Sequence, residues 1–256
     1  MRVLMIGDVV GRPGRRAVAA LLPSLRVELQ LDLVIANGEN LAAGRGITPT
    51  TAQELLAAGV DVITSGNHIW DRREVFPQLD PDGGLPLIRP HNYPPGAPGR
   101  GWIRRGGVTV INLMGRVFMA PVADDPFRSA DALLAEIGND GPVILDFHAE
   151  ASSEKLGIGW HLDGRVAAVV GTHTHVPTAD ARVLPKGTAL VCDVGMVGAR
   201  DSIIGDQVGD VLERFLTGMP NRLTVAEGPA VFNSVLIEID PTTHLARGIS
   251  RVDREY

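Results

Sequence analysis

Short runs of apolar residues recur along the chain, and several of them end abruptly in polar residues. Runs rich in Val, Ile and Leu that are bounded by glycine or polar residues are typical of buried strands. We therefore predict buried strands over residues 2–6, 31–36, 60–64, 142–147 and 166–170. The polar residues at their carboxyl ends are the part of the pattern that bears on function.

Helical spacing separates these strands. Residues 15–30 carry apolar side chains three and four positions apart, which predicts an amphipathic helix in which Pro23 marks a kink or a restart. Thr48 and the proline after it predict the start of a helix over 49–58, which Gly59 ends. Further helices are predicted over residues 127–137, over 152–160, within 204–216, and in a short stretch that Asp71 caps and that ends at Phe76.

Paired strands mark much of the remaining chain. Residues 101–105 and 108–113 are predicted to form a hairpin across two glycines, and residues 230–239 and 243–252 a second one. Shorter strands are predicted over 85–89, 182–184 and 188–191, whereas glycines cluster in 193–198, where no strand is predicted. Alternating strands and helices followed by hairpins favour a mixed α/β fold. We expect a two-sheet β-sandwich flanked by helices rather than an eight-stranded barrel.

The composition limits this outline further. Of the 256 residues, 45% are hydrophobic and only 4% aromatic, so an aliphatic core is expected. Neither a repeat nor a linker divides the sequence, which predicts a single domain over residues 1–256. Cys192 is the lone cysteine and cannot form an internal disulfide, which fits a reducing compartment. With no signal-peptide pattern and no bilayer-length apolar run, we expect a cytoplasmic protein that does not contact membranes.

The formal net charge of −6 argues against bulk electrostatic binding of nucleic acid. A local positive centre, such as a metal ion, is still compatible with binding a phosphate group. The glycine-rich stretch 11–14 lacks the Lys-Ser/Thr ending of a phosphate-binding loop, and we interpret it as a strand-to-helix turn. Arg12 in this turn is either a phosphate-binding residue or a solvated loop side chain.

Metal-ligating residue types follow five of the predicted strands. They are Asp8, Glu39 with Asn40, Asn67 with His68, His148, and the pair His173 and His175. Each alone has a plainer interpretation, as a turn residue, a solvated carboxylate, a core histidine or two surface histidines. Ligands of open α/β sheets bind at the carboxyl ends of strands, where these side chains are expected to meet. Together they predict a metal site.

The donor set indicates the class of metal. Carboxylate, amide and imidazole donors without cysteine exclude a thiolate zinc site and suit manganese, iron, cobalt or catalytic zinc. Three imidazoles, two carboxylates and the amides are too many for one catalytic ion. They suit two metals about 3.5–4 Å apart, joined by a bridging carboxylate. With Asp8, Glu39 and a bridging hydroxide, two divalent ions keep a single positive charge, which matches a phosphodiester and also tolerates a phosphomonoester.

Several motifs resemble those of the calcineurin-like metallophosphoesterases. They are Gly7-Asp8, Gly66-Asn67-His68, Asp146-Phe147-His148 and Gly171-Thr172-His173-Thr174-His175, in the order of that family. Val10 stands where the family has a histidine, Asn37-Gly38-Glu39-Asn40 replaces an Asp-containing block, and the acid after His68 is displaced to Asp71. These departures, with the stretches 7–14 and 193–196, resemble the YmdB-type bacterial phosphodiesterases over essentially the whole chain.

The resemblance implies a four-layer α-β-β-α fold, a homo-oligomer, and hydrolysis of 2′,3′-cyclic or 3′,5′-cyclic nucleotides by a metal-bridging hydroxide. A phosphodiester at an RNA end is a second substrate of the same chemistry. Iron or manganese is favoured over zinc or cobalt, because Asn40 would supply an amide oxygen in the position that Val10 leaves empty. The implied site places Asp8, Asn40 and His175 at one metal, Asn67, His148 and His173 at the other, Glu39 as the bridge, and His68 at the substrate oxygens.

Two other functions fit the same residues. A phosphomonoesterase would use the same metals, and a non-catalytic regulatory module would use the site for binding alone. The residues after the strands do not distinguish these functions from a phosphodiesterase.

Overall fold

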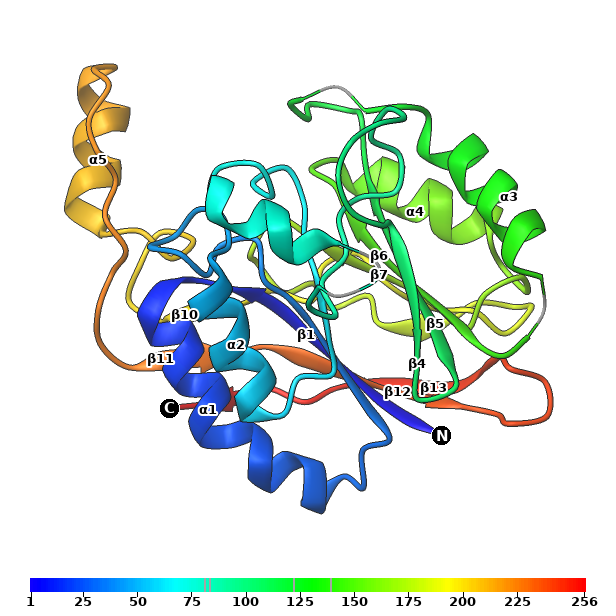
Figure 1. The fold of residues 1–256 in the computed structure, drawn as a ribbon. Coiled ribbons are helices and arrows are strands. Elements are labelled where there is room, and N and C mark those ends of the chain that lie inside the picture. Colours follow the sequence, from blue (N-terminus) through cyan, green and yellow to red (C-terminus); the bar gives the residue numbers. More distant parts are fainter. Residues whose placement is uncertain (81, 83, 122, 139) are drawn as a thin grey trace.

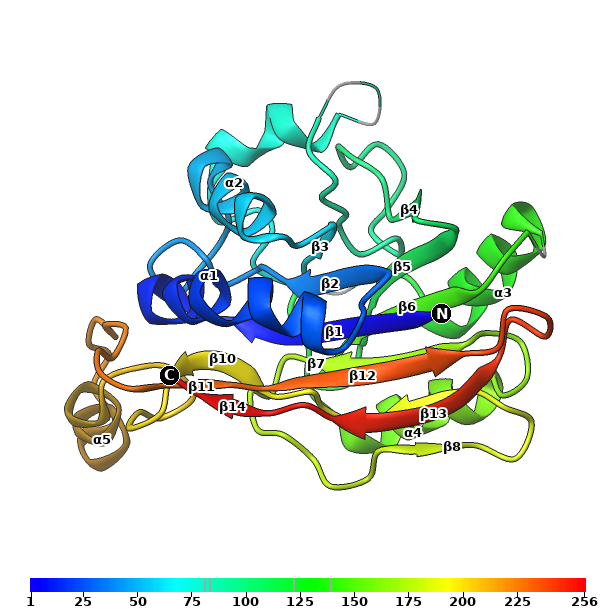
Figure 2. The same cartoon turned by 90° about the horizontal axis from the view of Figure 1, so that it is seen from below.

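Two β-sheets stack face to face, and helices cover their outer sides (Figures 1 and 2). The computed structural model describes residues 1–80, 82, 84–121, 123–138 and 140–256. Within these residues, one sheet has eight strands and the other has six. The predicted architecture, two packed sheets flanked by helices, is therefore confirmed.

The first sheet is built around strand β1 (Arg2–Val9). Its parallel neighbours are β2 (Leu33–Asn37), which leads on to β3 (Val62–Thr64), and β10 (Met196–Ala199). Strand β10 lies on the side of β1 opposite β2, and the rest of that side pairs antiparallel with β12 (Ser234–Ile239). The remaining strands are β11 (Ala230–Phe232), β13 (Ala246–Arg251) and β14 (Arg254–Glu255).

The second sheet has a parallel centre and a hairpin at one edge. Strands β5 (Val108–Met114), β6 (Val143–His148), β7 (Ala168–Thr172) and β9 (Ala189–Val191) run parallel in this order. Strand β4 (Trp102–Arg105) pairs with β5 across the two glycines, as predicted. The opposite edge is the short strand β8 (Arg182–Val183).

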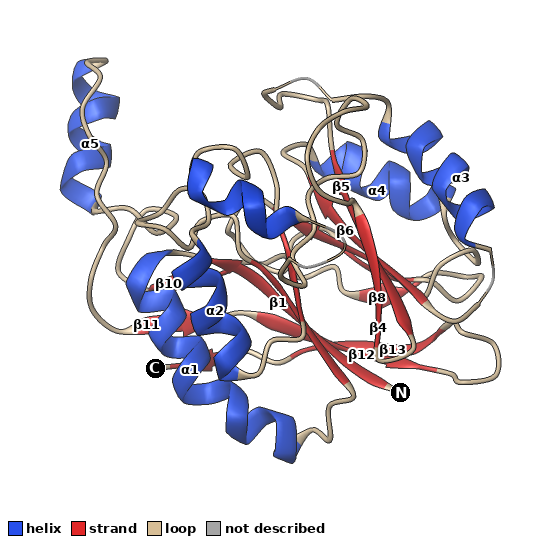
Figure 3. Cartoon of the chain, in the orientation of Figure 1, coloured by secondary structure: helices blue, strands red, loops and turns tan. Residues whose placement is uncertain are grey.

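Apolar side chains fill three layers between these elements. Helices α1 (Gly11–Glu28) and α2 (Pro49–Ala58) pack on the outer face of the first sheet, and α3 (Pro126–Ile137) and α4 (Ser152–His161) on that of the second (Figure 3). Alternate residues of β1 and β2 face the opposite way and meet β5, β6 and β7 in the central layer. No helix in the described part of the chain is both long and apolar enough to cross a membrane.

Helix α5 (Val208–Thr217) differs from the other helices, because it projects away from the sandwich (Figure 1). Within it only Val211 is buried. The segment that carries α5 leaves the sandwich after β10 and returns before β11. Both ends of this segment therefore lie beside the carboxyl end of β1.

Several local predictions were wrong. Of the two alternatives at Pro23, the restart is excluded, because helix α1 continues through it. The short helix after Asp71 is present as a 3₁₀ helix, η1 (Arg73–Leu79), but its N-cap is Arg72 and it ends beyond Phe76. Residues 85–89 form only an isolated bridge from Leu87 to β3. The glycine cluster contains the unpredicted strand β10, and the strand expected over 230–239 is interrupted at residue 233.

Candidate metal centre

The carboxyl ends of five strands meet at one edge of the sandwich. In the first sheet, Asp8 of β1 pairs with Asn37 of β2, which pairs with Thr64 of β3. In the second, His148 of β6 pairs with Thr172 of β7. The candidate metal ligands lie in these positions or within three residues after them. The local register therefore brings together side chains that are far apart in the sequence.

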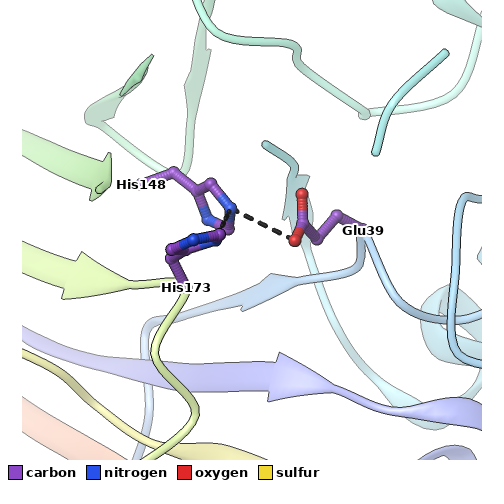
Figure 4. A group of neighbouring side chains, drawn as sticks. All are labelled: Glu39, His148 and His173. Atoms are coloured by element: carbon purple, nitrogen blue, oxygen red, sulfur yellow. Dashed lines mark hydrogen bonds and ion pairs between the residues drawn. The ribbon is translucent and has the colours of Figure 1, made fainter. Parts of the chain in front are cut away.

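One group of donor atoms surrounds the Nε2 atom of His148. Glu39 Oε1 lies 3.1 Å from it, Asn67 Oδ1 3.0 Å and His173 Nδ1 3.0 Å. Figure 4 shows the side chains of Glu39, His148 and His173 pointing toward one another. Glu39 and His148 are buried, and His173 is partly buried. We call these four residues the first donor group.

The other ring nitrogen of His148 has a fixed partner. Its Nδ1 atom lies 2.9 Å from the Thr172 hydroxyl, which in turn donates to Asp146 Oδ1 at 2.7 Å. Thr172 Oγ1 therefore accepts a hydrogen bond from Nδ1–H, so Nε2 is the nitrogen that offers a lone pair when the ring is neutral. Lone pairs of four donors then converge on one position, where a cation satisfies them together. The first donor group thus fits a transition metal ion.

Two buried oxygens beside this group have no hydrogen-bond partner among the described residues. They are Asp8 Oδ1 and Asn40 Oδ1, and both side chains are almost fully buried. His175 Nε2 lies 3.9 Å from Asp8 Oδ1. Buried oxygens left without partners are rare, and an ion is one of the groups that satisfies them. We call Asp8, Asn40 and His175 the second donor group, because a cation bound here would give both unpartnered oxygens a partner.

The charges of the buried groups depend on one another. Burial raises the pKa of Asp8 to about 7. Burial also acts to raise the pKa of Glu39, but His148 and the His68 backbone amide lower it to about 2. For His148, burial is outweighed by Glu39 and Asp8, which raise the pKa to about 9. Without a metal, Glu39 and His148 are therefore an ion pair, and a metal would displace the proton of His148.

The loop after β7 directs its two histidines apart. Strand β7 ends at Thr172, and both His173 and His175 have positive φ, +101° and +66°. The backbone at these two histidines is therefore not extended. His173 reaches the first donor group, whereas His175 reaches the second. Strained backbone of this kind persists at functional sites where the surroundings hold it.

A buried ion pair holds this strained loop in place. Lys155 Nζ lies 2.7 Å from Asp193 Oδ2, and both side chains are nearly inaccessible. The same oxygen accepts hydrogen bonds from the backbone amide and the hydroxyl of Thr174, at 3.1 and 2.7 Å. Thr174 lies between the two histidines, so this contact fixes both of their backbone positions.

His68 lies at the rim of the centre. Its amide donates to Glu39 Oε2 at 3.1 Å, and its Nδ1 atom is 3.0 Å from Asp71 Oδ2. The Arg45 guanidinium lies 3.1 Å from the same Asp71 oxygen. Asp71 was noticed in the sequence as a helix cap and as a displaced acid, and no sequence signal pointed to Arg45. Glu150 was also missed; its Oε2 atom lies 3.1 Å from His173 Nε2 and orients that ring.

A pocket of 390 Å³ opens beside the donor groups. Its polar lining includes residues of both groups and the rim, and its apolar lining consists of Val10, Ile204 and Leu223. Arg12 is exposed on α1 and is not among the lining residues. A larger cavity of 560 Å³ lies near the start of β6, away from the donor groups. The smaller pocket is therefore the candidate site, because it alone of these two borders the converging donors.

Comparisons with known proteins agree with this geometry. The family model described as "YmdB-like protein" matches residues 4–252. A 2′,3′-cyclic-nucleotide 2′-phosphodiesterase of Bacillus subtilis is 49% identical, covering 98% of this chain and 96% of the relative. A putative phosphatase/phosphodiesterase of Mycoplasma genitalium is 35% identical, covering 98% and 92%.

Two solved structures share the whole fold. A hypothetical protein from Thermus thermophilus superposes with a TM-score of 0.93 at 47% identity, covering 100% of this chain and 99% of that one. A phosphatase from Mycoplasma pneumoniae superposes with a TM-score of 0.92 at 32% identity, covering 100% and 93%. The likeness therefore extends over the full sandwich, and this chain belongs to the YmdB-like family.

Proposed function

We propose that this chain is a dinuclear metal-dependent phosphodiesterase that hydrolyses cyclic nucleotides, 2′,3′-cyclic nucleotides first and 3′,5′-cyclic nucleotides as the broader class. The observation that carries the proposal is the pair of donor groups, one around His148 Nε2 and one around the unpartnered oxygen of Asp8. Names of relatives support the same class, since they include a phosphodiesterase and a phosphatase/phosphodiesterase. The chain is a phosphoric diester hydrolase.

The two donor groups divide the ligands between two metals. Asn67, His148 and His173 would hold one ion, and Asp8, Asn40 and His175 the other. Glu39 is buried beside His148, and its negative charge helps to raise the pKa of Asp8. Its closeness to a residue of each donor group supports a role as the bridging carboxylate. Oxygen and imidazole donors without thiolates favour iron or manganese, with zinc and cobalt as alternatives. Elemental analysis of purified protein tests this assignment, with two transition metals per chain expected.

The bound metals would supply Lewis acidity, which lowers the pKa of a water molecule and offsets charge on the phosphoryl oxygens. The chain's own residues then orient the substrate. His68 lies at the pocket wall and is held by Asp71 and Glu39, so it can donate to a phosphoryl oxygen or protonate the departing ribose oxygen. Arg45 lies beside His68 and adds positive charge where the phosphate would enter.

The substrate class follows from charge and size. Two divalent metals, Asp8, Glu39 and one hydroxide would leave a single positive charge, which matches the monoanionic phosphodiester of a cyclic nucleotide. A pocket of 390 Å³ lies within the range of small-molecule sites. We expect kcat/KM to be higher for 2′,3′-cyclic than for 3′,5′-cyclic nucleotides, and higher for a chromogenic diester than for the matching monoester.

A phosphomonoesterase is the second candidate, because relatives from two mycoplasmas carry the word phosphatase in their names. The paired chromogenic assay separates the two activities. A clear preference for the monoester would reject the phosphodiesterase assignment. No turnover of either compound by protein holding two metals would instead favour a binding module.

Glu39→Gln tests the bridge, since it keeps the shape of the side chain and removes its charge. Loss of one ligand shared by both metals should lower turnover by more than about 100-fold, the upper range for changes of residues that only support a ligand. Circular dichroism should show an unchanged fold, and elemental analysis a lower metal content. Wild-type turnover with two metals still bound would show that Glu39 does not bridge.

A further inference from the structure

The turn from Ile203 to Asp206 has an unusual sequence for its shape. The two end residues exchange backbone hydrogen bonds, both 3.0 Å long. Its central residues, Ile204 and Gly205, have φ of +49° and +106°. Positive φ at both central positions defines a type I′ turn, which strongly prefers Asn-Gly. Ile204 is β-branched and is therefore under backbone strain that asparagine would not suffer.

The surroundings hold this turn in place. Gly205 packs on Val10, since a Cβ atom at residue 205 would lie 2.7 Å from a Val10 methyl. The Gly205 amide donates to the Ser202 hydroxyl at 3.0 Å, and its carbonyl accepts from the Ala226 amide at 2.9 Å. These contacts impose the left-handed backbone on residue 204 whatever its side chain is.

The backbone of Ile204 also has a function that needs no isoleucine. Its carbonyl accepts a hydrogen bond from His175 Nδ1 at 2.7 Å, which leaves His175 Nε2 facing Asp8. Any residue at this position would supply the same carbonyl. The side chain does not fill the core either, because Ile204 is 50% exposed. Neither the turn, the core nor His175 therefore accounts for an isoleucine here.

The exposed side chain lies at the pocket beside the donor groups. With Val10 and Leu223, Ile204 provides the apolar part of the lining, whose other residues are polar or charged apart from Gly44. Val10 is almost fully buried, so Ile204 and Leu223 present most of this apolar surface. A phosphate belongs with the metal donors, which leaves the apolar wall for a different part of the substrate.

We propose that Ile204, together with Leu223, contacts the face of the substrate's nucleobase and thereby makes the enzyme prefer nucleotides over cyclic phosphates that lack a base. The inference rests on the proposed phosphodiesterase function and adds its specificity-determining residues. A flat, apolar base face is the part of a cyclic nucleotide that matches aliphatic side chains. The contact accounts for an isoleucine at a position whose backbone favours asparagine.

Ile204→Asn is the decisive variant, because it supplies the residue that the turn prefers and keeps the carbonyl for His175. With metal-loaded protein, KM for adenosine 2′,3′-cyclic phosphate should rise about tenfold, which corresponds to about 1.4 kcal/mol. The kcat/KM for the cyclic phosphate of glycerol, which lacks a base, should stay unchanged. The melting temperature should not fall, since strain is relieved.

Two further variants separate the side chain from the backbone. Ile204→Val keeps the β-branch and the strain but is smaller, so a smaller rise in KM for the nucleotide is expected. Leu223→Ala should raise the same KM without touching the turn. If Ile204→Asn lowers kcat/KM equally for both substrates, or changes it for neither, the proposed contact is wrong.

A binding measurement keeps this test apart from the test of activity. Calorimetry with adenosine 3′-monophosphate and with inorganic phosphate uses the same metal-loaded proteins. Ile204→Asn should weaken the nucleotide about tenfold and leave phosphate unchanged. If wild-type protein hydrolyses neither cyclic phosphate but shows this pattern, the phosphodiesterase assignment fails and the base contact stands. Equal weakening of both ligands, or of neither, overturns the contact.

Discussion

At the scale of single residues, the arrangement around Thr172 decides how His148 can act. The Thr172 hydroxyl accepts a hydrogen bond from Nδ1 of His148 and donates one to the buried Asp146. Asp146 also accepts from the Asn37 amide at 3.1 Å and from the Thr64 hydroxyl. A set of buried groups at the strand ends therefore holds the imidazole with Nε2 toward the other donors.

Thr172→Val keeps the shape of the side chain but removes this hydroxyl. We expect metal affinity to fall by about 10–100-fold, the range for residues that orient a metal ligand. Competition with a chromogenic chelator measures the affinity. Thr172→Ser is the matched control and should retain wild-type affinity. Equal metal affinity of the Val variant and wild type would show that the Thr172 hydroxyl does not decide which nitrogen of His148 carries the proton.

Metal binding should depend on pH in a defined direction. A metal ligand must be deprotonated, and the metal-free pKa values are about 9 for His148 and about 7 for Asp8. Protons therefore compete with metal below these values, so apparent affinity should increase as pH rises from 6 toward 9, and binding near neutral pH should release protons. Calorimetry at one pH in buffers of different ionisation enthalpy counts them. Proton uptake, or none, would contradict this coupling.

At the scale of elements, strand ends were predictable and loop geometry was not. Apolar runs predicted β1, β2, β3, β6 and β7 within a few residues, and their polar ends supplied every residue of the two donor groups. The division of those residues between two metals came from the family resemblance instead. Sequence patterns cannot give such a division, because it depends on positive φ at His173 and His175.

Strand β10 and the pocket wall show why the remaining features escaped prediction. Strand β10 contains Gly198, and its four residues become a strand only because β1 and β11 lie on either side. Arg45 and Ile204 lie in loops whose positions are set by contacts with distant segments. No local periodicity records such contacts, so the directions of these side chains could not be predicted from the sequence.

Helix α5 is the element that most clearly bears on oligomerisation. It leaves Phe215 at 73% and Leu216 at 84% exposed, and Leu212 at 45%. Exposed apolar side chains gathered on one projecting helix are typical of interaction surfaces. The homo-oligomer expected from the family resemblance would cover them.

Changing both Phe215 and Leu216 to Ser should therefore lower the mass of the particle in sedimentation equilibrium, while metal content stays the same. Glu213→Gln on the same helix is the control and should leave the mass unchanged. A wild-type monomer, or a variant with unaltered mass, would show that α5 does not mediate assembly.

At the scale of the whole molecule, both donor groups draw on both sheets. Asp8, Glu39, Asn40 and Asn67 lie at or after the carboxyl ends of strands of the first sheet. His148, His173 and His175 lie at or after those of the second. Metals held in this way would join the two sheets at one edge. They would bind the folded chain and not the unfolded one, and so stabilise it by mass action.

Removing the metals should consequently lower the melting temperature. At free metal 100-fold above the dissociation constant, the linkage contributes about 2.7 kcal/mol for each bound ion, or roughly 5–10 °C per ion for a chain of this size. Differential scanning calorimetry with and without a chelator measures the shift. Glu39→Gln should show a smaller shift than wild type. Identical melting with and without chelator would mean that the donors hold no structural metal.

The position of β1 has a consequence for how the protein matures. This strand begins the chain, yet one of its edges is closed by β10 and β12, which begin at residues 196 and 234. During synthesis on the ribosome, β1 therefore keeps an open edge until most of the chain has emerged. His173 and His175 also emerge long after Asp8, whose carboxylate accepts the His173 amide across 165 residues. Both donor groups are therefore complete only after residue 175 has emerged, and an interrupted chain would expose its central strand to pairing with other chains.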